Sequence, residues 1–379
     1  MALGQGAFVF LVPVFSHELG AGLASASFIF ALIGIGVLSA DIPAGLLVAR
    51  LGEKKTMFIA LFSLFLLNLC ATQVSAIWQL AILTWAVGFG SGTWLFARLH
   101  FVTHNVDIAV RGRAMSVLGG IQRFGAFAGP IIAGFIAELI QTNAAYYFTA
   151  GTTVLGAAMV LFHLPTTSAA SLQPHTHLST SIEIFKSYLP IFRTAGLSIF
   201  CLQLIRGARQ VALPLWAIAI GLSPSENGLV YGLGFFIDMC LFYPAGFIMD
   251  RKGRKWALIP CLAIIATAIC LLPLSVGFYS LLAISLLAAV GNGLGAGINM
   301  TLGADYSPKD RSSAFLGVWR FTGDMGASVG PILMGGLINL FTLSVACVGL
   351  AGVGYFGAWL ASTKVQETRA MVLMPDEKT

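Results

Sequence analysis

The stretch Pro244-Ala-Gly-Phe-Ile-Met-Asp-Arg-Lys-Gly-Arg-Lys255 lies between two long apolar runs and decides the fold. An apolar helix that ends in a glycine turn flanked by arginine and lysine is typical of a loop at the cytoplasmic surface of a membrane. A related stretch, Pro43-Ala-Gly-Leu-Leu-Val-Ala-Arg-Leu-Gly-Glu-Lys-Lys55, occurs 201 residues earlier. Because the same hairpin occurs twice, we infer that the chain is an internal duplication.

The composition excludes a water-soluble fold. Of the 379 residues, 58% are hydrophobic and 9% are charged, whereas a soluble domain carries about 25% charged residues. The net charge of +6 does not indicate a nucleic-acid partner, because the basic residues form short clusters between apolar runs. All six cysteines lie inside apolar runs without metal-like spacing, so we expect no metal and no cofactor.

The sequence predicts an all-α membrane protein with twelve transmembrane helices, each near the roughly 20 apolar residues that cross a bilayer. The predicted spans are residues 1–15, 25–50, 56–74, 77–103, 113–140, 143–164, 187–220, 225–249, 256–276, 279–303, 312–340 and 342–363. Residues 165–186 form a central linker between an N-terminal bundle, 1–164, and a C-terminal bundle, 187–363. Residues 364–379 form a tail.

The basic residues predict the orientation. Five arginines lie inside spans. Every other lysine and arginine lies in a loop that joins an even-numbered span to the next span, at a span end that faces such a loop, or in the tail. The positive-inside rule therefore places both termini and the linker in the cytoplasm. The lack of a soluble domain or targeting extension favours an inner membrane of bacterial type. The first span is short for a bilayer, so we expect a natural start upstream of Met1 or a missing front half-helix.

The separation of 201 residues extends beyond the hairpin and predicts two six-helix repeats in parallel orientation. It also relates two helix-kink motifs in the fifth and eleventh spans. These motifs are Gly125, Gly129 and Pro130, and Gly326, Gly330 and Pro331. Small residues four positions apart let helices approach closely, and proline kinks a span.

Together these features resemble the major facilitator superfamily of secondary transporters. The residues that carry the resemblance are Gly246, Asp250, Arg251, Gly253, Arg254 and Lys255 in the second hairpin, and Gly45, Arg50, Gly52 and Lys54 in the first. The first hairpin departs from the family's pattern at Ala49, where the family has an acid, which puts the helix-end charge interaction there in doubt. The resemblance implies alternating access around a midplane site that binds a small-molecule substrate, with the first, fourth, seventh and tenth helices lining the cavity.

Two further motifs have alternative interpretations. The loops that begin at Asp107 and Asp305 combine acidic and basic residues. The resemblance implies that these loops contact the hairpins and hold the cytoplasmic side closed in one state. The alternative is that their charges only determine which side of the membrane the loops face. The motif from Gly125 to Gly134 is similar to one in the family's drug/proton antiporters, although close helix packing alone would select it.

Charged side chains at bilayer depth cost roughly 2.5–3.5 kcal/mol each on insertion scales, so they have a partner or a function. Setting Glu138 aside near an outer end, five cations and three acids lie within spans: Arg98, Arg123, Arg206, Arg209, Arg320, Asp41, Asp238 and Asp324. We predict a network through the seventh, eighth and eleventh helices. The first half lacks it, since Gln5, Phe8 and Val37 stand at the equivalent positions.

These buried charges suggest roles. Asp238, Asp324 and Asp41 are candidate proton carriers, because burial raises a carboxyl pKa and a nearby arginine lowers it. Arg206, Arg209, Arg320, Arg98 and Asn292 are candidates for substrate or ion-pair contacts. The alternative is that Arg206 and Arg209 with Asp238, and Arg320 with Asp324, are closed structural ion pairs and that Arg98 reaches the headgroups.

The sequence therefore predicts a secondary transporter that moves a small organic solute, with proton-coupled efflux of drug-like compounds as the first hypothesis. Transport of an anionic metabolite is the alternative, because the interior arginines outnumber the acids. A non-transporting receptor or scaffold on the same fold is a further alternative, and no enzymatic activity is expected. The expected partners are the substrate, protons and the lipid bilayer, and the expected state is a monomer.

Overall fold

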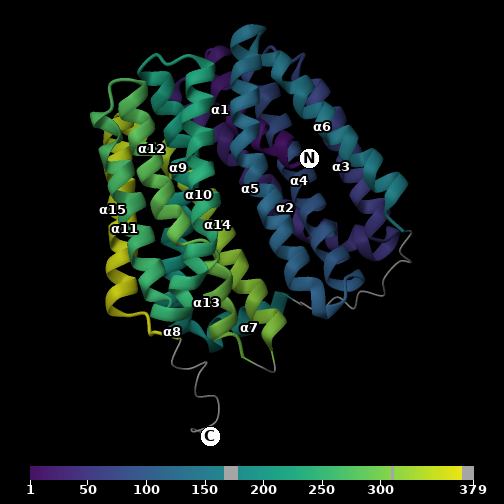
Figure 1. The fold of residues 1–379 in the computed structure, drawn as a ribbon, viewed down its shortest axis with the longest axis vertical. Helices are drawn as coiled ribbons and strands as arrows, with labels where there is room; N and C mark the ends of the chain where they lie inside the picture. Colours follow the sequence, from purple (N-terminus) through teal and green to yellow (C-terminus); the bar gives the residue numbers. More distant parts are fainter. Residues whose placement is uncertain (166–177, 309–310, 369–379) are drawn as a thin grey trace, which may run out of the picture. The chain divides into compact units, whose positions relative to one another are not determined.

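The computed structural model describes residues 1–165, 178–308 and 311–368, which form helices joined by turns (Figure 1). The first half contains six helices: α1 Ala2–Glu18, α2 Leu23–Leu51, α3 Glu53–Ala71, α4 Ile77–Asn105, α5 Ile108–Leu139 and α6 Thr142–His163. The second half contains α7 Leu178–Ser187, α8 Leu189–Ile191, a π-helical turn Phe192–Gly196, α9 Leu197–Ala219, α10 Pro224–Lys252, α11 Lys255–Leu271, a 3₁₀ turn Leu272–Leu274, α12 Phe278–Leu294, α13 Ile298–Tyr306, α14 Ser312–Leu340 and α15 Leu343–Thr363.

The predicted membrane spans correspond to these helices. Ten helical segments of the described chain are long and apolar enough to cross a membrane, by length and composition. The remaining two predicted spans correspond to α1, with 17 residues, and α14, with 29 residues. The prediction of an all-α membrane protein is confirmed.

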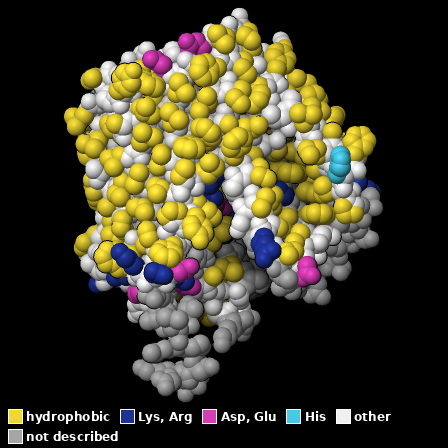
Figure 2. All heavy atoms as spheres, viewed as in Figure 1, with side chains coloured by type: hydrophobic (Ala, Val, Ile, Leu, Met, Phe, Trp, Pro, Cys, Tyr) yellow, Lys and Arg dark blue, Asp and Glu magenta, His cyan; other side chains and the backbone are white. Residues whose placement is uncertain are grey.

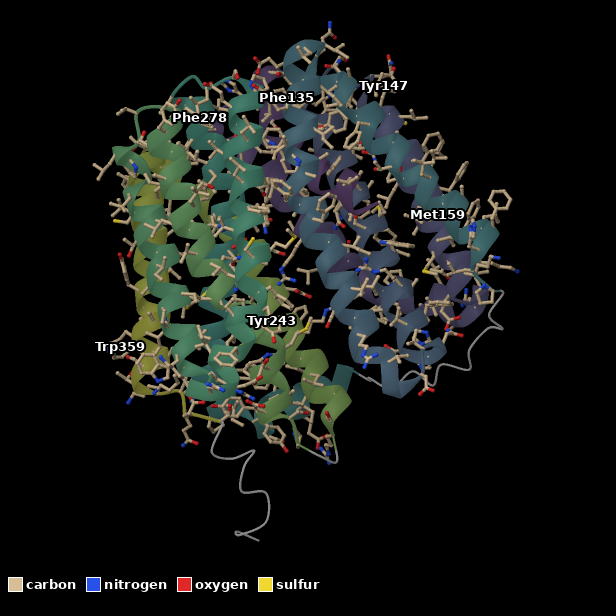
Figure 3. All side chains as sticks on the ribbon, in the orientation of Figure 1. Phe135, Tyr147, Met159, Tyr243, Phe278 and Trp359 are labelled. Atoms are coloured by element: carbon tan, nitrogen blue, oxygen red, sulfur yellow. The ribbon has the colours of Figure 1, made fainter. Side chains whose placement is uncertain are left out.

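The surface of the helices is apolar, as a lipid-facing surface must be. Large apolar side chains are exposed on several helices, among them Met159 on α6, Tyr243 on α10 and Trp359 on α15 (Figure 3). Over α11, α12 and α15 the face in Figure 2 is covered by apolar side chains, and lysine and arginine gather at one end of these helices. This pattern fits a hydrocarbon belt with a basic rim.

The chain divides into two compact units. Unit 1 contains Met1–Leu172 and Pro214–Phe236, and unit 2 contains Gln173–Leu213 and Ile237–Thr379. The domain boundaries drawn from the sequence remain predictions. Most of the central linker, 166–177, and the end of the tail, 369–379, lie outside the described residues.

The helix bounds and glycine turns repeat at the separation seen in the sequence. Helix α10 begins and ends 201 residues after α2. Five described residues have positive φ, and all five are glycines. Gly20 is equivalent to Gly221, and Gly52 to Gly253, at the same separation of 201 residues. The residue equivalent to Gly297 is Phe96, which is not a glycine. Gly297 therefore marks a place where the second half departs from the first.

That departure is a helix break. The tenth span, predicted as residues 279–303, is divided into α12 and α13 by Gly295, Ala296 and Gly297. Gly297 has φ of 83°, a left-handed conformation that glycine adopts without the clash that a Cβ would cause. The equivalent residues of α4 are Trp94, Leu95 and Phe96, and α4 runs through them unbroken.

The glycines of the two helix-kink motifs lie where two helices touch through their backbones. A Cβ at Gly125 or Gly129 would clash with the backbone of α1, and a Cβ at Gly326 or Gly330 with the backbone of α9. Within unit 1, a Cβ at Gly134 would lie 2.6 Å from the carbonyl oxygen of Pro224 at the start of α10. Helix α5 therefore lies in backbone contact with α1 and with the beginning of α10.

Candidate functional site

A buried ion pair joins α9 to α10 in unit 2. Arg209 Nη2 donates a hydrogen bond of 3.1 Å to Asp238 Oδ2, and the two side chains are 5% and 4% exposed. Desolvating both charges costs several kcal/mol per ion, which only close geometry and further hydrogen bonds offset. The pairing expected from the sequence between the seventh and eighth helices is present.

The further hydrogen bond comes from α12. Asn292 Nδ2 donates to the same oxygen, Asp238 Oδ2, at 2.8 Å. The third helix in this network is therefore the tenth span. We had expected the eleventh span, and its Arg320 and Asp324 pair with each other on α14.

Arg206, one turn before Arg209, contacts backbone oxygens at the helix break. Its Nη2 lies 3.0 Å from Gly295 O and 3.3 Å from Asn292 O, and its Nη1 donates to Gln203 Oε1 at 3.1 Å. The last carbonyls of a helix carry partial negative charge without intrahelical partners, so a guanidinium stabilises them. Arg206 therefore caps the broken end of α12.

Three polar atoms of this cluster are buried without a hydrogen-bond partner among the described residues: Arg206 Nε, Asp238 Oδ1 and Asn292 Oδ1. An unsatisfied buried polar group costs roughly 1–3 kcal/mol. Two cations and one carboxylate give the cluster an excess positive charge. A cluster with spare acceptors on a carboxylate and a spare donor on a guanidinium can take up a proton or a ligand.

The pair on α14 is more open. Arg320 Nε lies 3.3 Å from Asp324 Oδ2, and the side chains are 43% and 32% exposed. Ser328, one turn further, donates to the carbonyl oxygen of Asp324. The Asp324 side chain is therefore less enclosed by protein than that of Asp238.

The candidates of unit 1 lie on α4 and α2. Arg98 on α4 donates from Nη2 to Gln122 Oε1 on α5 at 3.1 Å, and its guanidinium lies 5.9 Å from the ring centre of Trp94. Asp41 lies on α2 and is partly buried. Gln122 was not among the predicted residues, because an amide carries no charge that needs explaining.

The two hairpins use equivalent lysines, Lys54 and Lys255, in the same way. Lys54 Nζ donates to Leu164 O at the end of α6, at 2.6 Å, and Lys255 Nζ donates to Ser362 O near the end of α15, at 2.7 Å. A cation near a helix C-terminus is favoured by the helix dipole. These lysines therefore tie the third helix of each half to its sixth.

The second hairpin also contacts the tenth span and the tail. Arg254 Nε donates to Asp305 Oδ2 at 2.9 Å, and this hydrogen bond raises the pKa of the Arg254 guanidinium above its ordinary value. Glu367 accepts from the backbone amides of Arg254 and Lys255 at 2.8 and 3.0 Å. The expected contact between a hairpin and an acidic loop is therefore present inside unit 2. Asp250 is largely exposed, and Arg251 lies over the ring of Phe247.

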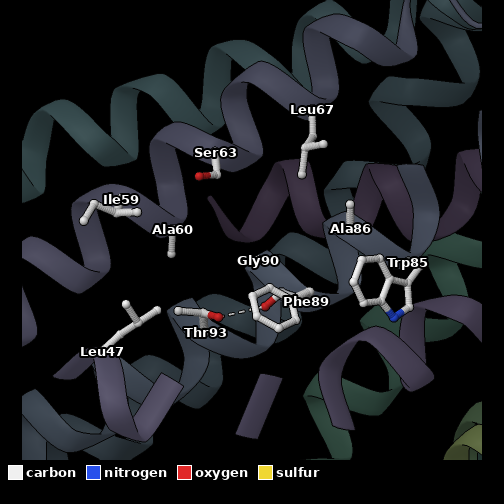
Figure 4. Close-up of a pocket in the computed structure, with 10 residues that line it drawn as sticks. All are labelled: Leu47, Ile59, Ala60, Ser63, Leu67, Trp85, Ala86, Phe89, Gly90 and Thr93. Atoms are coloured by element: carbon white, nitrogen blue, oxygen red, sulfur yellow. Dashed lines mark hydrogen bonds between the residues drawn. The ribbon is translucent and has the colours of Figure 1, made fainter. Parts of the chain in front are cut away.

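An apolar hollow of about 210 Å³ opens between α2, α3 and α4 (Figure 4). Its lining is almost wholly apolar, and the hydroxyl of Thr93 donates to the carbonyl oxygen of Phe89. A hollow of this kind suits lipid chains or apolar groups, and it holds none of the charged candidates.

The sequence of this fold matches a known family. The family model described as Major Facilitator Superfamily matches residues 1–205 and 195–372. The chain belongs to the Major Facilitator Superfamily. As a member of this superfamily it is a secondary transporter of small molecules across a membrane, which confirms the family and the general function predicted from the hairpins.

Curated relatives and solved structures of this superfamily add detail. The chain is 26% identical over 159 residues to the multidrug resistance protein MdtG of Salmonella heidelberg, which covers 41% of the chain and 39% of MdtG. The match thus spans about two-fifths of the relative's length. The fold is similar to that of a POT family transporter in complex with 5-aminolevulinic acid, with a TM-score of 0.77, 12% identity and coverage of 95% and 93% of the two chains. It is also similar to the nucleoside transporter NupG, with a TM-score of 0.74, 14% identity and coverage of 96% and 98%.

Proposed function

We propose that this transporter exports small drug-like molecules in exchange for protons. The match to a multidrug resistance protein supports export, although it covers less than half of either chain. Proton coupling is supported by the environment of the Asp238 carboxylate. Its Oδ2 accepts hydrogen bonds from Arg209 and Asn292, and its Oδ1 is buried without a hydrogen-bond partner among the described residues.

The carboxylate suits a coupling role because its environment depends on two neighbours that lie on other helices. When Arg209 and Asn292 donate to Asp238, the ionised form is stabilised; when they withdraw, burial favours the protonated form. Any movement of α9 or α12 relative to α10 therefore changes the proton affinity of this group. Asp324, which is more exposed, provides a second carboxyl for proton exchange, and Asp41 a third.

A second candidate function is transport of an organic anion. Arg206 lacks a carboxylate partner among the described residues, since its guanidinium contacts Gln203, Cys261 and backbone oxygens. Net positive charge at bilayer depth attracts an anionic group. In this version Arg206 and Asn292 of unit 2 contact the substrate.

Transport into proteoliposomes with an imposed pH gradient tests these proposals. We expect a lipophilic cation such as ethidium to move against a proton gradient, and Asp238→Asn and Asp324→Asn to abolish this exchange. If each variant retained gradient-driven transport, the assignment of the coupling residues would be wrong. Preferential uptake of organic anions would instead support the second function, and an absence of any flux would favour a receptor or scaffold.

We also propose that the basic rim faces the cytoplasm of a bacterial inner membrane and that the transporting unit is a monomer. The basic hairpins support the orientation, because cytoplasmic loops are enriched in lysine and arginine. Labelling of single cysteines at Gly52 and Gly253 with an impermeant reagent tests it, since both should react from the same side. Light scattering of the purified protein tests the monomer.

A further inference from the structure

A cluster of three metal-ligating side chains lies in unit 1, where the beginning of α3 meets the end of α4, and its first α4 member follows Arg98 by two residues. Glu53 begins α3, directly after the turn at Gly52, and His100 and His104 lie one turn apart near the end of α4. One ligand atom from each of the three side chains lies within 4.8 Å of the others.

Each histidine of this cluster holds one ring nitrogen against an oxygen. His100 Nδ1 lies 3.0 Å from Glu53 Oε1, and His104 Nδ1 lies 2.9 Å from the carbonyl oxygen of His100. The contact between His100 Nδ1 and Glu53 Oε1 joins two groups that can both bind a metal ion, the carboxylate through its oxygen and a neutral imidazole through the nitrogen that carries its lone pair. His100 Nε2 is buried without a hydrogen-bond partner among the described residues, and the His100 side chain is 9% exposed.

The two rings face each other. They are stacked with centroids 4.0 Å apart and an angle of 19° between their planes. Histidines at i and i+4 of a helix, together with a carboxylate, are ligands that Zn²⁺ and similar divalent ions prefer. Zn–N and Zn–O bonds of roughly 2.0–2.2 Å place ligand atoms on one tetrahedral ion about 3.3 Å apart. His100 Nδ1 and Glu53 Oε1, which lie 3.0 Å apart, are already close to this separation, and a rotation of the exposed His104 side chain would bring a third ligand onto the ion.

The equivalent place in unit 2 has the opposite charges and no metal ligands of this kind. Glu53 corresponds to Arg254 and His104 to Asp305, each 201 residues later, and Arg254 donates to Asp305 at 2.9 Å. His100 corresponds to Thr301. An arginine–aspartate pair joins the second hairpin to its tenth span in this structure. In the first half the same positions carry a carboxylate and an imidazole, which a cation can bridge.

We propose that Glu53, His100 and His104 form a binding site for a divalent metal ion of the Zn²⁺ type. The ion ties the beginning of α3 to the end of α4, as Arg254 and Asp305 tie the corresponding helices of the second half. Because Zn²⁺ binds the deprotonated carboxylate and the neutral imidazoles, binding releases any proton that these groups carry. The site is independent of the substrate and of the direction of transport.

Titration of the whole purified chain with Zn²⁺ tests this site. The protein is purified with a histidine-free tag and stripped with a chelator, and Zn²⁺ is added in competition with a chromophoric chelator. We expect one equivalent to bind, and His104→Ala, whose side chain is exposed, to weaken binding at least about tenfold. Addition of Zn²⁺ should raise the melting temperature of the unmodified chain and leave that of the variant unchanged.

Two control variants make the test specific. His175 and His177 in the central linker form a second histidine pair in the sequence, so His175→Ala/His177→Ala must retain the bound equivalent. Glu53→Arg/His104→Asp recreates the residues of the second half, so we expect it to fold and to lose the metal. Unchanged Zn²⁺ binding by His104→Ala, or loss of binding by the linker variant alone, would overturn the proposal.

Discussion

Arg209 Nη2 lies 3.1 Å from Asp238 Oδ2, and both side chains are at least 95% buried. This pair joins α9 to α10, and removal of Arg209 takes from the buried Asp238 carboxylate its paired cation and leaves it the hydrogen bond from Asn292. Breaking a buried pair in this way costs roughly 3–5 kcal/mol. We therefore expect Arg209→Met to lower the thermal unfolding temperature in detergent strongly.

The matched double variant separates the charge from the side-chain packing. Arg209→Met/Asp238→Asn removes both charges and keeps similar volumes, so it should recover most of the lost stability. It should still fail to exchange protons, because the carboxyl is gone. Equal instability of the single and double variants would show that packing around Arg209, and not the ion pair, stabilises this part of unit 2.

The break between α12 and α13 gives a second prediction. Gly297 has φ of 83°, and a side chain in the left-handed region costs roughly 1–2 kcal/mol. Gly297→Ala should lower the free energy of unfolding by about this amount and displace the carbonyl of Gly295 from Arg206. Gly336→Ala on α14 is the control, since nothing lies within 4 Å of its added Cβ. Equal melting temperatures for both variants would contradict the left-handed turn.

The helices themselves could be predicted closely from the sequence. The second span was expected at 25–50 and α2 covers Leu23–Leu51, because a run of apolar residues long enough to cross a bilayer has few alternatives to a helix. The pairing of Arg209 with Asp238 could also be predicted, since both charges lie at bilayer depth and each needs a partner.

Backbone partners could not be predicted in this way. Arg206 contacts the carbonyl oxygen of Gly295, and a carbonyl is present at every residue, so the sequence does not distinguish this one. The available signal was the density of glycines from Gly291 to Gly297, which favours an interrupted helix. Contacts between distant segments were hidden for a similar reason. Glu138, set aside as a residue near an outer end, accepts from Ser223 and Ser225.

The contact between α5 and the beginning of α10 leads to a third prediction. A Cβ at Gly228 would lie 2.5 Å from the carbonyl oxygen of Pro130, so Gly228→Ala must push the two helices apart. Overpacking of this kind costs roughly 1–3 kcal/mol. The hydrogen bonds from Ser223 and Ser225 to Glu138 should weaken with it.

Cysteine labelling measures this separation. In a background without the six native cysteines, Ser225→Cys should react slowly with a water-soluble maleimide, because Ser225 is 9% exposed. Adding Gly228→Ala should raise the rate several-fold, whereas adding Gly151→Ala on α6 should leave it unchanged, since nothing lies within 4 Å of that position. If neither Gly228→Ala nor Gly151→Ala changed the rate of maleimide labelling, α10 would tolerate the added methyl group without moving.

The last prediction concerns the tail. The Glu367 carboxylate accepts hydrogen bonds from the amides of Arg254, the N-cap of α11, and Lys255, its first residue, where helix amides lack intrahelical partners. Loss of a capping acceptor costs typically about 1 kcal/mol, so Glu367→Ala should destabilise unit 2 modestly and release the segment after α15. Limited digestion with trypsin should then cut after Lys364 several-fold faster. Glu226→Ala at the start of α10 is the control, and an unchanged rate of cleavage in Glu367→Ala would show that other contacts, such as Tyr306 Oη to Gln366 O, suffice to hold the tail.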